Sequence, residues 1–78
     1  MEFKDYLKQK HLLNANEKKL MDKSIDQYIS RLENLRLYGI YNEEKQIDSV
    51  LEQKIQEHYQ DWKMYRKTIE HYLSSKNY

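Results

Sequence analysis

The apolar residues of this chain recur at every third or fourth position in each long segment, and no segment alternates like a β-strand. This spacing places the apolar side chains along one side of a helix. It predicts an all-α fold, a small bundle of three to four amphipathic helices. Because none of these helices could bury its apolar stripe alone, we expect them to pack together in one domain over residues 1–78.

The first half of the chain predicts a short helix from about residue 2 to about residue 11 and a second helical region between residues 14 and 38. Asn14 is a suitable N-cap, and Glu17 could complete a capping box with it. Ser24 could instead cap a separate helix beginning at residue 25, so this region forms either one helix or two. Gly39 predicts the end of the helix, since glycine adopts the left-handed C′ conformation without a Cβ penalty.

The second half predicts a third helix opening near Asn42, with acidic residues in its first turn. Residues 60–61 offer a break, with Asp61 as the cap of a fourth helix. No glycine or proline separates these two helices, so they could also form one continuous rod. We expect residues 74–78 to fray.

Charge and hydropathy restrict the classes of function. The net charge is only +1 and cysteine is absent, which rules out disulfides and thiolate metal sites. No apolar run approaches the roughly 18 residues that a membrane span needs. The charged first ten residues are unlike a secretory signal peptide, so we expect a cytoplasmic protein that does not act at a membrane.

Catalytic and metal-binding patterns are missing from the sequence. The histidines at positions 11, 58 and 71 lack the i,i+4 spacing of a zinc site, and we expect His58 at the core edge and His71 on the surface. A single glycine allows neither a phosphate-binding loop nor a nucleophile elbow. We therefore expect no enzyme, no small-molecule substrate, no metal and no cofactor.

The polar faces of the second and fourth helices carry uncompensated positive charge. Lys23, Gln27, Arg31 and Asn34 follow one another along the second helix without an acidic residue in the stripe. Lys63, Arg66 and Lys67 share a turn of the fourth helix. Lysine and arginine contact phosphates, and Gln, Asn and Arg reach base edges, so these faces are candidate DNA-binding surfaces. The alternative is that they are only solvated.

Three segments carry a resemblance to a known family: FKDYL at 3–7, KSIDQYISRLENL at 23–35 and YRKTIEHYL at 65–73. In order and pattern they resemble the SAM-like N-terminal core-binding domain of phage-type integrases, the tyrosine recombinases. The resemblance implies a four-helix domain that clamps duplex DNA with its second and fourth helices. The residues it places against DNA are Lys23, Ser24, Gln27, Arg31, Lys63, Arg66 and Lys67. No catalytic domain follows, which implies a non-enzymatic module or accessory protein of a phage, plasmid or similar mobile element.

A helical adaptor or inhibitor that binds a protein, or a homodimer, is the rival hypothesis. It rests on the near-neutral charge and on the eight tyrosines, since Tyr, Trp and Arg are enriched at interface hot spots. Tyr38 and Tyr41 flank the glycine turn and are expected to be exposed. Trp62 is the third candidate partner-binding residue, although it could equally fill the core between the third and fourth helices.

Overall fold

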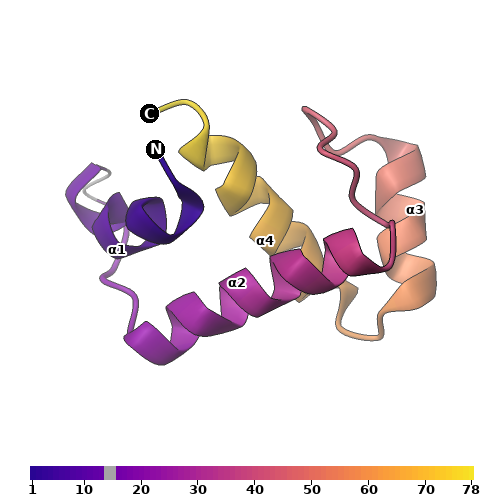
Figure 1. Ribbon diagram of the computed structural model, residues 1–78, viewed down its shortest axis with the longest axis horizontal. Helices are drawn as coiled ribbons and strands as arrows, with labels where there is room; N and C mark the ends of the chain where they lie inside the picture. Colours follow the sequence, from indigo (N-terminus) through magenta and orange to yellow (C-terminus); the bar gives the residue numbers. More distant parts are fainter. Residues whose placement is uncertain (14–15) are drawn as a thin grey trace.

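A computed structural model describes residues 1–13 and 16–78 of the chain. It contains four helices: α1 (Phe3–Leu13), α2 (Asp22–Leu37), α3 (Ser49–His58) and α4 (Trp62–Ser75) (Figure 1). The described residues contain no strand, so the predicted all-α bundle is confirmed.

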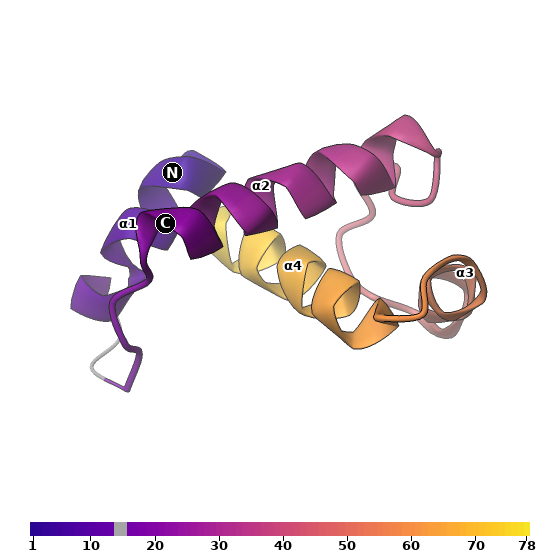
Figure 2. The same ribbon diagram turned by 90° about the horizontal axis from the view of Figure 1, so that it is seen from below.

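Helix α4 is the central element, because it packs against each of the other three helices. Helices α2 and α4 cross at the middle of the molecule, with α1 at one end of the pair and α3 at the other (Figure 2). The two chain ends meet beside α1, where the amino group of Met1 lies 2.5 Å from the backbone oxygen of Tyr78.

The core consists of two clusters of buried side chains. The larger one lies between α2, α3 and α4 and comprises Leu32, Leu35, Ile40, Tyr41, Leu51, Ile55 and Ile69. The smaller one lies between α1 and α2 and comprises Tyr6, Leu7, Ile25 and Tyr28. The apolar stripe predicted for the second helix therefore supplies residues to both clusters.

Gly39 ends α2 as predicted, with a φ of +66°. Its N–H donates to the carbonyl of Arg36, and the N–H of Ile40 donates to the carbonyl of Leu35. This pair of hydrogen bonds is the Schellman motif, which also brings Ile40 against Leu35 in the core.

The predicted start of the third helix near Asn42 is wrong, because α3 begins at Ser49. Residues 40–48 form an irregular loop, with Glu43 at a φ of +62°, and its first two side chains enter the core. Asn42 Nδ2 donates to the carbonyl of Gly39, and the hydroxyl of Tyr41 donates to the carbonyl of Glu44. Such local bonds give the backbone an alternative to a helix. Asp48 is the actual N-cap, with its carboxylate accepting from Leu51 N–H at 2.8 Å.

The second helical region is a single helix that begins at Asp22, so Ser24 lies inside its first turn and does not cap it. The predicted cap at Asn14 lies outside the described residues. Residues 17–21 are not helical, and Glu17 forms an ion pair with Lys10 of α1. This ion pair holds Glu17 beside α1.

The third and fourth helices are separate, and Asp61 occupies the N-cap position of α4 without a side-chain capping bond. The expected fraying of residues 74–78 is wrong for Ser74 and Ser75, which belong to α4. Ser75 is buried, and the ring of Tyr78 stacks on that of Tyr6 with centroids 5.8 Å apart.

Candidate functional site

The charges of α2 are divided between its two sides. Asp22 and Asp26 line a shallow hollow together with Lys4 and Lys8 of α1. Lys23 and Gln27 are exposed on the other side of the helix. Packing α1 against α2 thus places Asp22 and Asp26 beside lysines of α1 and leaves the exposed Lys23 and Gln27 outside that hollow.

Arg31 lies where this stripe meets α4. Its guanidinium carbon is 5.7 Å from the ring centroid of Tyr28, and its positive charge acts on the hydroxyl of Tyr65 at the start of α4. Tyr28 also contacts the ring of His71 in an edge-on arrangement, with centroids 5.1 Å apart. Arg31 therefore lies near the start of α4.

Two lysines of α4 extend this basic surface. Lys63 and Lys67 are exposed and lie one helical turn apart. Lys67 is close enough to His71 for its charge to disfavour protonation of that imidazole. The term basic seam is used below for the surface made by Lys23, Gln27, Arg31, Lys63 and Lys67.

Arg66 does not belong to the basic seam. Its guanidinium forms ion pairs with Glu52 of α3 at 3.3 Å and with Glu70 at 3.1 Å. The side chain thus faces α3, and two carboxylates compensate its charge. Ser24 is half-buried in the first turn of α2.

The three candidate partner-binding residues have different environments. Tyr38 is 58% exposed and packs against the ring of His58. The expectation that Tyr41 is exposed is wrong, since it is 1% exposed within the larger core cluster. Trp62 is half-buried and packs against that cluster, which corresponds to its alternative reading as core filler.

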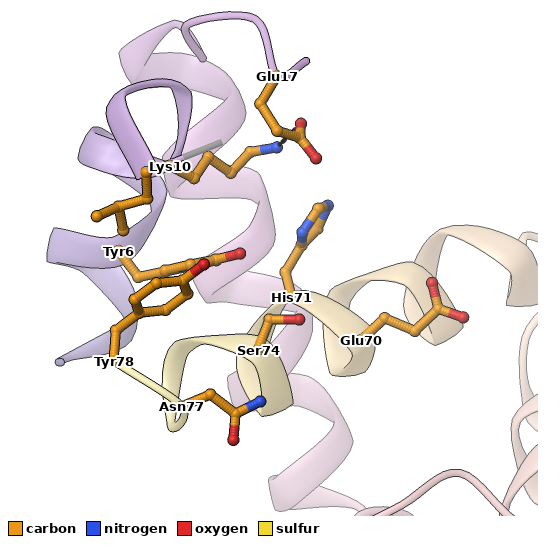
Figure 3. Close-up of a pocket in the computed structure, with 9 residues that line it drawn as sticks. Tyr6, Lys10, Glu17, Glu70, His71, Ser74, Asn77 and Tyr78 are labelled. Carbon is orange, nitrogen blue, oxygen red and sulfur yellow. Dashed lines mark hydrogen bonds and ion pairs between the residues drawn. The ribbon is translucent and has the colours of Figure 1, made fainter. Parts of the chain in front are cut away.

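A polar pocket lies between α1, residue 17 and the C-terminal end of α4 (Figure 3). Its volume is about 500 Å³. The residues that line it are Tyr6, Lys10, Leu13, Glu17, Glu70, His71, Ser74, Asn77 and Tyr78. Sequence reasoning missed this pocket. The available signal was the position of Lys10 on the same helix face as Tyr6 and Leu7.

Lys10 and His71 dominate the polar wall of this pocket. Lys10 is only 4% exposed, and its ammonium group lies 2.5 Å from a carboxylate oxygen of Glu17. Burial lowers the pKa of His71 to about 4, and the charges of Lys10 and Lys67 act in the same direction. His71 is therefore neutral at pH 7, and among the described residues its Nε2 atom has no hydrogen-bond partner.

The expected positions of two histidines are wrong. His58 is exposed at the end of α3, whereas His71 is half-buried beside α1 and α2. The ring of His58 packs against the rings of Tyr38 and Tyr59 and belongs to neither core cluster.

Within residues 1–13 and 16–78, no group of three or more His, Cys, Asp or Glu side chains is arranged to hold a metal ion. In the same residues, no helix combines the length and apolar character required to cross a membrane. No protein-family model, curated protein or solved structure matches the chain.

Proposed function

We propose that this protein is a small non-enzymatic module that binds duplex DNA through the basic seam. The observations that support the proposal are the acid-free stripe of α2, the position of Arg31 near Tyr65 at the start of α4, and the exposure of Lys63 and Lys67 on α4. The acids of α2 face α1, and Arg66 is neutralised by two carboxylates. Four cations thus remain to contact phosphates, and Gln27 is the side chain suited to a base edge.

The biological setting belongs to the same proposal. Residues 23–35 and 65–73 resemble segments of the core-binding domain of phage-type integrases. On that basis we propose an accessory role in a phage or another mobile element. Arg66, which the resemblance places against DNA, is left out of the contact surface because of its ion pairs with Glu52 and Glu70.

Salt dependence is the first test of the proposal. Each phosphate neutralised on duplex DNA contributes a slope of about −0.9 to the dependence of log K on log salt, so four contacts give a slope of about −3 to −4. Fluorescence anisotropy with a labelled duplex, measured from low to physiological salt, gives this slope directly. Failure to bind any duplex at low salt would contradict the proposal.

Two variants test whether the basic seam, and not a neighbouring basic residue, contacts DNA. Lys67→Ala should weaken binding and reduce the salt slope by about one, because one phosphate contact is lost. Arg66→Ala is the matched control, since it removes an adjacent cation that already has two acidic partners. The seam is the wrong surface if the two substitutions weaken binding equally.

A protein partner is the second candidate function. Leu37 and Tyr38 at the end of α2 are 77% and 58% exposed, and adjacent exposed apolar side chains are a common feature of interfaces. A second copy of this chain is the partner to test first. Light scattering should then report a dimer that Leu37→Gln converts to a monomer, and a monomeric wild-type protein would exclude self-association.

A further inference from the structure

Among the described residues, the polar pocket of Figure 3 contains polar atoms whose hydrogen-bonding capacity is not fully used. The ammonium group of Lys10 carries three N–H bonds, and Glu17 accepts one of them. His71 extends from α4 toward the same space, and its Nε2 atom has no partner among the described residues. Buried polar atoms are nearly always paired, so an exception of this kind requires an explanation.

The carboxylates that line the pocket do not need these donors. Glu17 is paired with Lys10, and this hydrogen bond lowers the pKa of its carboxyl group. Glu70 is paired with Arg66 at 3.1 Å, and its side chain points away from Lys10 in Figure 3. Lys67 adds a positive charge that acts on His71. The hydrogen-bonding groups of Lys10 and His71 that the carboxylates do not use are therefore suited to an additional negatively charged group.

The opposite wall of the pocket is aromatic. Tyr78 is 57% exposed and stacks on Tyr6 at 5.8 Å, and the hydroxyl groups of both rings are directed toward the interior of the pocket. A volume of about 500 Å³ lies within the range of small-molecule sites and exceeds what an inorganic ion would fill. An organic group next to the anion would therefore find a flat surface on Tyr78.

We propose that this pocket binds a small organic anion, either a carboxylate or a phosphate monoester. The charged group accepts hydrogen bonds from Lys10 and His71, and the organic group packs against Tyr78. This site is separate from the basic seam and does not depend on DNA binding.

Proton NMR of the histidine rings is the direct test. In a buffer free of phosphate and carboxylate, phenyl phosphate or benzoate should shift the His71 resonances and raise the pKa of His71, because a bound anion favours the imidazolium form. His58 provides an internal control, since it lies beside Tyr38 and Tyr59 at the other end of the molecule. Absence of a His71 shift at about 10 mM of both anions, well above the Kd of a weak specific ligand, would overturn the proposal.

Two further probes distinguish the parts of the site. Benzyl alcohol carries the ring without the charge, and equal binding of it would refute recognition of an anion. Inorganic phosphate carries the charge without the ring, and affinity equal to that of phenyl phosphate would refute the role of Tyr78. A short DNA duplex that perturbs His71 when neither small anion does would assign the pocket to backbone phosphates and overturn the proposal.

Variants test the two recognition residues. His71→Gln and Lys10→Met should each weaken phenyl phosphate or benzoate by about tenfold, the loss expected for one charge-assisted hydrogen bond. Lys54→Met is the matched control, because it removes an exposed lysine of α3 outside the pocket and should leave affinity within about twofold. If Lys10→Met fails to fold, as judged by circular dichroism, His71→Gln decides the outcome. Unchanged affinity in folded His71→Gln would overturn the assignment.

Discussion

The hydroxyl group of Tyr59 donates a hydrogen bond of 2.6 Å to the side-chain oxygen of Asn34, which lies 25 positions earlier in the chain. The same ring stacks on Tyr65, with centroids 3.6 Å apart and planes 10° apart. Burial raises the pKa of Tyr59 to about 12. One side chain at the end of α3 therefore connects α2 with α4, the two helices that form the basic seam.

Removing only the hydroxyl of this tyrosine tests that connection. Tyr59→Phe should lower the free energy of unfolding by about 1 kcal/mol, because Asn34 loses its partner while the ring stack remains. Urea denaturation gives the difference. Tyr38→Phe is the control, since Tyr38 is 58% exposed and its substitution should change stability by less than about 0.5 kcal/mol. Equal effects of the two substitutions would contradict a special role for the Tyr59 hydroxyl.

Replacing the N-cap aspartate by alanine should destabilise the protein more at α3 than at α4. Asp48→Ala should destabilise the protein by about 1 kcal/mol, because its carboxylate accepts from the N–H of Leu51 at 2.8 Å. Asp61 occupies the N-cap of α4 without such a bond, so Asp61→Ala should cost clearly less. Thermal or urea unfolding of both variants would decide, and a larger loss for Asp61→Ala would show that the capping assignment is wrong.

Helical periodicity predicted most of the buried face of α2 because that face depends on spacing alone. Of the five apolar positions that share this face between residues 25 and 35, Ile25, Tyr28, Leu32 and Leu35 are buried and Ile29 is half-buried. The start of α3 was not predictable in this way. Residues 42–44 have the composition of a helix start, yet they lie in an irregular loop that follows the insertion of Ile40 and Tyr41 into the core. Such a contact depends on how distant helices pack.

The candidate sites could likewise be predicted only in part from the sequence. The acid-free stripe of α2 is visible in the sequence, but the neutralisation of Arg66 by Glu52 brings together residues of two helices. The polar pocket requires Lys10 and His71 to meet from opposite ends of the chain. Residue spacing within one helix carries no information on such pairs, which follow only from the placement of α1 against α4.

The left-handed conformation of Gly39 predicts an order of stability for three residues at this position. Gly39→Ala should cost about 1 kcal/mol, because φ is +66° at this position. Apart from Gly39 and its two chain neighbours, no heavy atom of the described residues lies within 4 Å of the place that a Cβ would occupy, so the cost is conformational and not steric. Gly39→Asn should therefore recover part of the loss, since asparagine tolerates this region better than alanine. Unfolding midpoints that fail to rank Gly above Asn above Ala would contradict this account.

His71 predicts a loss of stability in mild acid. Its pKa is lowered from 6.5 to about 4 in the folded protein, mainly by burial, so the unfolded chain binds the proton more readily. The contribution of His71 to the free energy of unfolding should therefore be fully present above pH 6.5 and be lost as the pH is lowered toward 4. The full shift would correspond to about 3 kcal/mol, and solvent screening at this half-buried site reduces the expected loss to on the order of 1 kcal/mol.

The pH range over which stability is lost distinguishes the effect of His71 from that of the carboxylates. Hydrogen bonding to Lys10 lowers the pKa of Glu17 below its usual 4.5, so its contribution is lost only as the pH falls below that value. Urea denaturation between pH 7 and pH 5 should thus show a decrease in wild type and His58→Gln that His71→Gln lacks. A decrease of equal size in His71→Gln would assign the acid sensitivity to another group.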